Sequence, residues 1–129
     1  ARYAAAGDPY GTRCRATARL VAERLGLPAE RWSLAFQSRV GRARWLEPYT
    51  EDRLRELGAA GTRRLAVACP GFAVDCLETL EEIAMRGRET FLASGGGEFE
   101  YIPALNDDAA QVDCLARLVA ARLGARPAA

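Results

Sequence analysis

The chain contains no histidine and no lysine, and few of its residues are aromatic. Its 129 residues include 18 basic residues, all of them arginine, and aromatic residues make up 8%. Without histidine these residues hold no histidine triad, no histidine general base and no histidine metal ligand. Chemistry carried by this chain must therefore use carboxylates, thiols or tyrosines.

The sequence also lacks closely paired cysteines. The four cysteines are Cys14, Cys69, Cys76 and Cys114. None forms a Cys-x-x-Cys pair, so neither a zinc ribbon nor a thioredoxin-like site is indicated. We expect buried, reduced thiols in a cytosolic protein.

Strong net charge and long apolar runs are absent as well. A net charge of +1 argues against binding nucleic acid or anionic membranes through bulk electrostatics. No apolar run approaches the roughly twenty residues of a membrane span, and no signal peptide is recognisable. Since half of the 129 residues are hydrophobic, we expect one soluble, cytoplasmic domain with a real core.

Residue patterns predict four helices and three strands that alternate along the chain. The predicted helices are 12–25, 51–57, 74–93 and 109–123, and the predicted strands are 32–37, 65–69 and 99–102. This order predicts an α/β fold with a doubly wound parallel sheet and helices on both faces. Thr50 is the expected N-cap of the second helix. Because the chain opens on a helix, we expect a further strand upstream of Ala1.

Three carboxylates follow the predicted strand 65–69. Asp75, Glu78 and Glu82 would share one face of a helix at the carboxyl end of this strand, where ligands gather in parallel sheets. The polar face of an amphipathic helix is an alternative, with Asp75 and Glu78 at capping-box spacing. Against it, like charges four residues apart cost a few tenths of a kcal/mol. The pair Glu78 and Glu82 could instead bind a cation or accept protons that leave a ligand.

Paired carboxylates can accept protons from a weakly acidic ligand, or pass a divalent metal along a hydrated path. Both roles call for partial burial, which would raise the pKa of a glutamate and couple the pair.

An arginine-rich loop precedes the second predicted helix. Arg39, Arg42 and Arg44 lie close to Trp45. The loop could be solvated, with Trp45 folded onto its own domain, or it could form an anion and aromatic platform over a planar ligand. A single strand of nucleic acid is the weaker competitor, because one small cluster lies on a neutral chain.

Several short motifs occur in a specific order and spacing over nearly the whole chain. They are Gly7-Asp8-Pro9-Tyr10, Gln37-Ser38-Arg39-Val40-Gly41, Trp45-Leu46, Pro48-Tyr49-Thr50, Cys69-Pro70-Gly71-Phe72, Asp75-Cys76-Leu77-Glu78-Thr79-Leu80-Glu81-Glu82-Ile83, Ile102-Pro103 and Leu105-Asn106. With these motifs the chain resembles the C-terminal half of a ferrochelatase, the enzyme that inserts ferrous iron into a porphyrin in haem synthesis. The segment 83–88 looks more like proteobacterial members.

The resemblance implies roles for individual residues. Glu78 matches the family's active-site glutamate, which takes pyrrole protons and contacts the metal, and Glu82 continues the acidic path one turn on. The positions matching porphyrin contacts are Gln37 and Ser38, near the propionates, with Trp45 and Phe72 along the pocket. The chain departs from the family at Cys76, where some members carry histidine, and at Ala84 and Arg86, where others have acids.

The resemblance also implies two similar doubly wound halves with the porphyrin between them. Residues 1–129 would be the C-terminal chelatase domain, without its first strand and without the N-terminal domain. The family's metal-binding histidine, in a Ser-x-His-Gly-x-Pro motif, would fall just before Ala1. The predicted upstream strand would carry it.

The expected partners are the porphyrin, ferrous iron as a substrate, and the N-terminal half of the same protein. Peripheral membrane contact is possible, and neither nucleic acid nor a transmembrane segment is expected. We expect no tightly bound cofactor. Some members hold an iron–sulphur cluster with closely spaced C-terminal cysteines, but only Cys114 lies in that region, so no cluster is expected. A non-catalytic tetrapyrrole- or metal-binding domain of the same fold is the alternative function.

Overall fold

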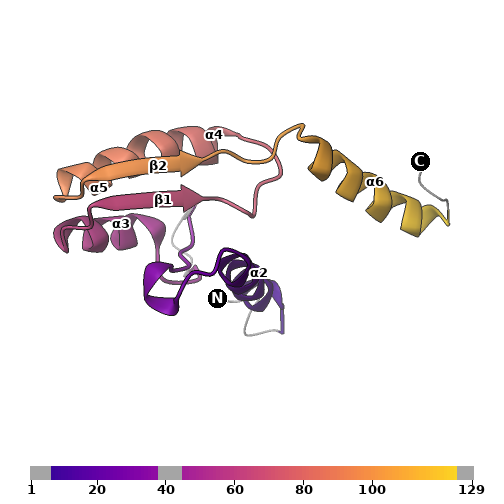
Figure 1. The fold of residues 1–129 in the computed structure, drawn as a ribbon, viewed down its shortest axis with the longest axis horizontal. Coiled ribbons are helices and arrows are strands. Elements are labelled where there is room, and N and C mark those ends of the chain that lie inside the picture. The colour runs from indigo at the N-terminus through magenta and orange to yellow at the C-terminus, as the bar shows by residue number, and fades with distance from the viewer. Residues whose placement is uncertain (1–6, 38–44, 125–129) are drawn as a thin grey trace.

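The computed structural model describes residues 7–37 and 45–124. Within them helices and strands alternate, and two strands form a parallel sheet (Figure 1). In chain order the elements are α2 (Tyr10–Arg24), the 3₁₀ helix η1 (Ala29–Arg31), α3 (Thr50–Ala59), β1 (Arg64–Ala68), α4 (Leu77–Thr79), the π-helix η2 (Leu80–Gly87), α5 (Arg88–Ala93), β2 (Glu98–Ile102) and α6 (Ala109–Leu123). The fold is therefore a helix-rich α/β fold with a parallel sheet.

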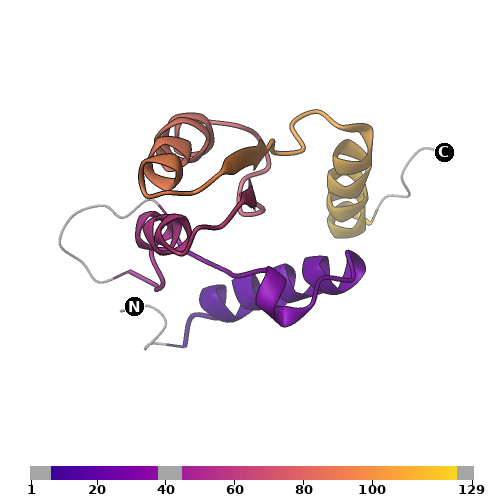
Figure 2. The same ribbon diagram turned by 60° about the vertical axis from the view of Figure 1, so that its left-hand side comes forward.

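The two strands pair in parallel along their full length, with Arg64 opposite Glu98 and Ala68 opposite Ile102. Burial alternates along both strands, so one face of the sheet is half-buried and the other is exposed. Figure 2 shows α3 and the α4–α5 segment on the same side of the strands, and Figure 1 shows α6 beyond the carboxyl ends of the strands. The doubly wound arrangement with helices on both faces therefore stays a prediction.

The core lies between the sheet and these helices. Phe91 is fully buried, and its ring centroid lies 6.0 Å from that of Phe99 on β2. Leu54 and Ile83 add buried side chains from α3 and η2. Burial of such side chains typically contributes about 1.5–3 kcal/mol each. The segments α4, η2 and α5 follow one another without a break from Leu77 to Ala93 and are called the acidic helix below. The apolar positions of α3, η2, α5 and β2 thus hold the acidic helix against the sheet.

Several predicted elements differ from the structure, and the largest differences concern the first predicted strand and the starts of two helices. The predicted strand 32–37 is reduced to one isolated bridge between Phe36 and Tyr49, because a strand needs a partner along its length and only Phe36 is paired among the described residues. Thr50 is the first residue of α3 and not its N-cap; the N-cap position is Tyr49, where the backbone is extended. The predicted helix 74–93 begins at Leu77, and its middle is a π-helix.

Apolar side chains remain exposed on α2 and α6. Those of α2 are Tyr10, Leu20 and Val21, and those of α6 are Val112, Leu115, Leu118, Val119 and Leu123. None of the helices in the described residues has the length and apolar character that crossing a membrane requires.

Candidate functional site

The site begins where β1 ends. After Ala68 the chain turns, with the backbone N–H of Phe72 donating to the carbonyl of Cys69 at 3.0 Å. Helix α4 then starts after Cys76, whose backbone N–H donates to the Thr79 hydroxyl at 3.0 Å. Thr79 is fully buried. Cys76 and Thr79, and not Asp75 and Glu78, therefore close the first turn of the acidic helix.

Asp75 joins the first turn of this helix to the end of β2, because its Oδ1 accepts a hydrogen bond from the Thr79 hydroxyl at 3.0 Å and further bonds from β2 and the loop after it. Its Oδ1 accepts hydrogen bonds from the Tyr101 hydroxyl at 2.6 Å and from the Ala104 backbone N–H at 3.2 Å. Oδ2 accepts from Asn106 Nδ2 at 3.0 Å, while the Asp75 backbone N–H donates to Asn106 Oδ1 at 2.9 Å. The prediction that Asp75, Glu78 and Glu82 share one helix face is therefore wrong for Asp75, because contacts with distant residues draw it to the loop after β2.

These bonds also set the ionisation of Asp75. Donation by the Tyr101 hydroxyl, and then by Asn106, lowers the pKa of the Asp75 carboxyl to about 2. Burial, followed by the neighbouring Asp75, raises the pKa of Tyr101. Asp75 is thus a fixed carboxylate at neutral pH, suited to holding the loop and not to releasing or taking protons.

Gln37 joins the other side of this region. Its Nε2 donates to the carbonyl oxygen of Glu78 at 2.6 Å, and its Oε1 accepts from the Cys69 thiol at 3.2 Å. Burial is the main cause that raises the pKa of Cys69 to about 11, followed by the charge of Glu82. The protonated thiol is the form that donates to Gln37.

A groove of about 820 Å³ runs between α3 and the acidic helix. This volume lies in the range of pockets that bind small molecules. The residues that line it are Phe36, Gln37, Tyr49, Thr50, Glu51, Asp52, Leu54, Arg55, Leu77, Glu78, Glu81, Glu82, Ile83, Arg86, Gly87 and Thr90. The structure thus brings Gln37, Glu78 and Glu82 to one groove.

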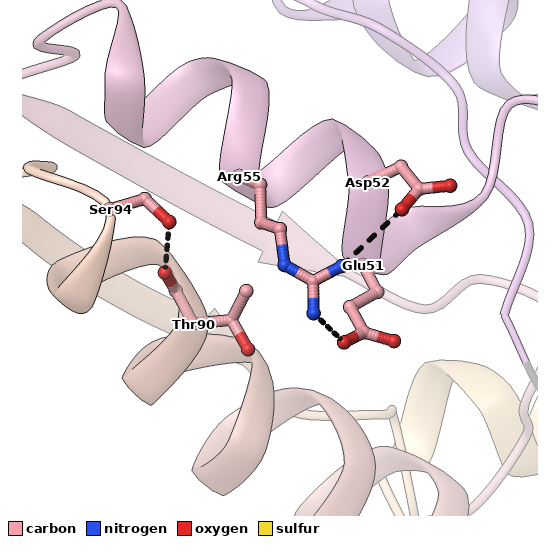
Figure 3. Close-up of polar contacts among 5 residues, drawn as sticks. All are labelled: Glu51, Asp52, Arg55, Thr90 and Ser94. Carbon is pink, nitrogen blue, oxygen red and sulfur yellow. Dashed lines mark hydrogen bonds and ion pairs between the residues drawn. The ribbon is translucent and has the colours of Figure 1, made fainter.

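Ion pairs occupy part of each wall of this groove. On α3, Arg55 pairs with Glu51 and, at 3.4 Å, with Asp52; Figure 3 shows these side chains beside Thr90 on α5. On the opposite wall, Arg86 Nε lies 2.8 Å from Glu81 Oε1. Exposed pairs of this kind add little stability. Both arginines among the lining residues, Arg55 and Arg86, are thus engaged by carboxylates.

Along the acidic helix, Glu78 and Glu82 are separated by the start of the π-helix at Leu80. A π-helix bonds each residue to one five positions on, so one turn takes more than four residues. Residues four apart are then brought closer to one line along the helix than in an α-helix. Both glutamates line the groove.

Glu78 is exposed and ionised. The Cys76 thiol, and then the backbone N–H of Glu78 itself, lower the pKa of its carboxyl below the usual value. The expectation that burial raises this pKa is therefore wrong for the described chain. An exposed carboxylate in this state can accept a proton or contact a cation without first losing its own proton.

Other predicted residues do not gather at the groove. Phe72 is half-buried and Trp45 is partly exposed, and neither is among the lining residues. Ser38, and the arginine-rich part of the loop before Trp45, lie outside the described residues. Within 7–37 and 45–124, no three His, Cys, Asp or Glu side chains converge to hold a metal ion. The predicted metal contact of Glu78 thus stays a prediction.

Three residues near the site had no role in the sequence analysis: Thr79, Tyr101 and Asn106. Tyr101 belongs to the half-buried face of β2, and Asn106 has a positive φ of 53°. Asparagine is one of the few residues that readily take this conformation, which is the one signal the sequence offered. Tyr101 and Asn106 contact Asp75 from 26 and 31 positions away, so no local pattern revealed these two contacts.

The fold and the groove define the class of protein. It is an α/β protein in which Glu78 and Glu82 line a groove beyond the carboxyl end of a parallel strand. The sequence pattern of the ferrochelatase family matches residues 1–123, and the chain belongs to this family.

Curated ferrochelatases support this membership. The chain is 58% identical to the ferrochelatase of Nitrosococcus oceani over 92% of its length, covering 32% of that relative. It is 54% identical to the ferrochelatase of Aeromonas hydrophila over 95% of its length and 56% identical to that of Klebsiella pneumoniae over 92%, covering 38% and 37% of them. The chain spans about a third of the length of these relatives.

Proposed function

We propose that the whole protein to which this chain belongs is a protoporphyrin ferrochelatase, which inserts ferrous iron into protoporphyrin IX to give protohaem. The observation that carries this proposal is the groove that Glu78 and Glu82 line from one helix, with Gln37 beside them and the pKa of Glu78 lowered. Family membership over residues 1–123 supports it. A non-catalytic tetrapyrrole-binding domain would need no such path of carboxylates.

In this mechanism the protein strains the macrocycle out of plane and exposes nitrogen lone pairs to the iron. Two pyrrole N–H bonds break, two protons leave, and the two nitrogens bind Fe²⁺. Glu78 takes a proton as the metal enters, because its carboxyl is already ionised. Glu82, one turn further along the groove, continues the acidic path for the proton or the cation. Iron is thus a substrate, and no tightly bound cofactor takes part.

We also propose that the chain belongs to the C-terminal half of a two-domain enzyme with two doubly wound halves. The opposite half would complete the porphyrin cleft, and the strand upstream of Ala1 would supply the metal-binding histidine. The exposed apolar side chains of α2 and α6 support a further covering structure. A cytoplasmic location and the absence of an iron–sulphur cluster remain predictions.

The substitution Glu78→Gln in the full-length protein tests the function. We expect kcat for iron insertion to fall by about 100-fold or more, the usual contribution of a general base, with the circular dichroism spectrum unchanged. Glu89→Gln is the matched control, because Glu89 is an exposed glutamate of α5 that does not line the groove. Retained turnover in Glu78→Gln would overturn the assignment.

A second measurement addresses the division into halves. We expect residues 1–129 alone to show negligible iron insertion, since half of the cleft and the histidine would be missing. Measurable insertion by this piece would contradict the two-half arrangement. Porphyrin binding by the full-length protein without any iron insertion would instead indicate the non-catalytic alternative.

A further inference from the structure

The side chain of Gln37 connects three segments that are far apart in sequence. Its amide nitrogen donates to the carbonyl oxygen of Glu78 at 2.6 Å, 41 positions away, and its amide oxygen accepts from the thiol of Cys69, 32 positions away. Both ends of the amide are therefore engaged by protein groups.

Only one orientation of the Gln37 amide satisfies both neighbours. A carbonyl oxygen can only accept, so the group that faces Glu78 must be the NH₂ end, while the thiol of Cys69 can donate to the oxygen end. Rotating the amide by half a turn would place two oxygen atoms 2.6 Å apart at Glu78. The Cys69 thiol thus helps to keep the donor aimed at the Glu78 carbonyl.

The backbone before Gln37 is also held in place. The Phe36 backbone N–H donates to the Pro48 carbonyl and its carbonyl accepts from the Thr50 N–H, both at 2.9 Å. The guanidinium of Arg15 lies 5.9 Å from the centre of the Phe36 ring. The backbone next to Gln37 is therefore held in place, and the Gln37 side chain can in turn hold the Glu78 carbonyl in place.

The partner carbonyl belongs to a special place in the acidic helix. Glu78 is in the three-residue α4, and the change to π hydrogen bonding begins two residues later at Leu80. The regular α-helical hydrogen-bond pattern changes at this point, and π-helical turns are frequent at functional sites. A side-chain donor at this carbonyl fixes the turn from which the Glu78 carboxylate projects into the groove.

We propose that Gln37 is a positioning residue for Glu78, acting through the backbone of the acidic helix and kept in orientation by the Cys69 thiol. This role rests on the proposed function for its catalytic consequence. It differs from the direct propionate contact that the family resemblance implies for Gln37. The two roles make opposite predictions for the steady-state constants.

The first experiment replaces the amide in the full-length protein. Gln37→Leu removes the donor with little change in size, and we expect kcat for iron insertion to fall about tenfold while KM for the porphyrin stays within twofold. Gln111→Leu is the matched control, because Gln111 Nε2 also donates to backbone carbonyls, those of Ala73 at 2.7 Å and Asn106 at 3.0 Å, but makes no bond to Glu78. We expect this control to keep the kcat of the unaltered protein.

A second pair of variants leaves Gln37 untouched. Cys69→Ala removes the thiol that orients the amide, whereas Cys69→Ser keeps a donor at the same place. We expect kcat to fall severalfold in Cys69→Ala and to be largely restored in Cys69→Ser. Equal losses in both would contradict the orienting role of the thiol.

Hydrogen–deuterium exchange tests the effect of the Gln37–Glu78 hydrogen bond on the acidic helix and does not require enzyme activity. Peptides covering residues 77–83 should exchange faster in Gln37→Leu than in the unaltered protein or in Gln111→Leu. Unchanged exchange, or a raised KM for the porphyrin at unchanged kcat, would overturn the proposal in favour of direct substrate contact. If the unaltered protein inserts no iron, the proposed function fails, and the exchange result alone still decides whether Gln37 holds the acidic helix.

Discussion

The hydroxyl of Tyr101 donates to Asp75 Oδ1 at 2.6 Å and joins the end of β2 to the turn that leads into the acidic helix. Asn106 completes this link through two reciprocal hydrogen bonds with Asp75. Together with the bond from Gln37 to Glu78, it holds the first turn of the acidic helix from two sides. Glu78 therefore lies on a helix whose start is determined by long-range contacts.

The link at Asp75 predicts a specific acid sensitivity. The pKa of Asp75 is about 2 in the folded chain and 3.8 in the reference state, so its stabilising effect is complete above about pH 4 and disappears as the pH falls towards 2. Asp75→Asn should remove this part of the pH dependence, measured by acid unfolding of the full-length protein followed by circular dichroism. Asp107→Asn, in the exposed loop before α6, is the control and should leave the profile unchanged. An unaltered acid profile in Asp75→Asn would contradict the role of the carboxylate.

The close contact between α3 and α5 predicts that Gly58 cannot be enlarged. A Cβ at this position would lie 2.6 Å from the Phe91 carbonyl oxygen, a backbone atom that cannot move away on its own. Alanine would favour the helix by about 0.5–1 kcal/mol, but overpacking costs about 1–3 kcal/mol, so we expect Gly58→Ala to be destabilising.

Urea unfolding of the full-length protein measures the effect of Gly58→Ala. Gly71→Ala is the control, because a Cβ at Gly71 meets no atom within 4 Å. If the urea concentration at the unfolding midpoint is the same for Gly58→Ala and the control, α3 and α5 can move apart without loss of stability, which would contradict the prediction.

The environment of Cys69 predicts low thiol reactivity. With a pKa of about 11, only about one thiol in a thousand is ionised at pH 8, and the thiolate is the reactive form. Cys114 is exposed on α6, contrary to the expectation of buried thiols. Iodoacetamide labelling followed by mass spectrometry should therefore modify Cys114 well before Cys69. Comparable rates at the two positions in the folded protein would be inconsistent with this environment.

The position of Glu82 predicts an effect different from that of Glu78. If Glu82 passes iron or protons along the groove, Glu82→Gln should lower kcat/KM for iron about tenfold, equivalent to about 1.4 kcal/mol, with KM for the porphyrin unchanged. The loss should be smaller than that in Glu78→Gln. Initial rates at varied iron concentration check this, and a larger loss in Glu82→Gln would reverse the two proposed roles.

Local sequence patterns predicted several elements correctly. The helix predicted at 109–123 is confirmed as α6, which ends at Gly124 in the left-handed conformation. The strands predicted at 65–69 and 99–102 are confirmed within one residue as β1 and β2. These elements have strong periodicity and clear stop signals in the chain itself, such as glycine after the last helical residue.

The grouping of the candidate site was predicted only in part. Glu78 and Glu82 line one groove, as their spacing on a helix suggested, and Gln37 joins them there. Asp75 does not, because Tyr101 and Asn106 hold its carboxylate. Helical spacing describes neighbours within one element, whereas these partners come from other elements of the chain.

By itself the sequence determined the alternation of helices and strands, the parallel sheet, and the placement of two glutamates after a strand, because hydrophobic periodicity and turn residues act over a few positions. Only the tertiary structure decided where the acidic helix begins, which of its carboxylates face the groove, and that Gln37 holds the Glu78 carbonyl. The start of the helix also uses local bonds between Cys76 and Thr79. The bonds that hold Asp75 and the Glu78 carbonyl join residues more than 20 positions apart, and such bonds form only when the packed helices and strands bring their partners together.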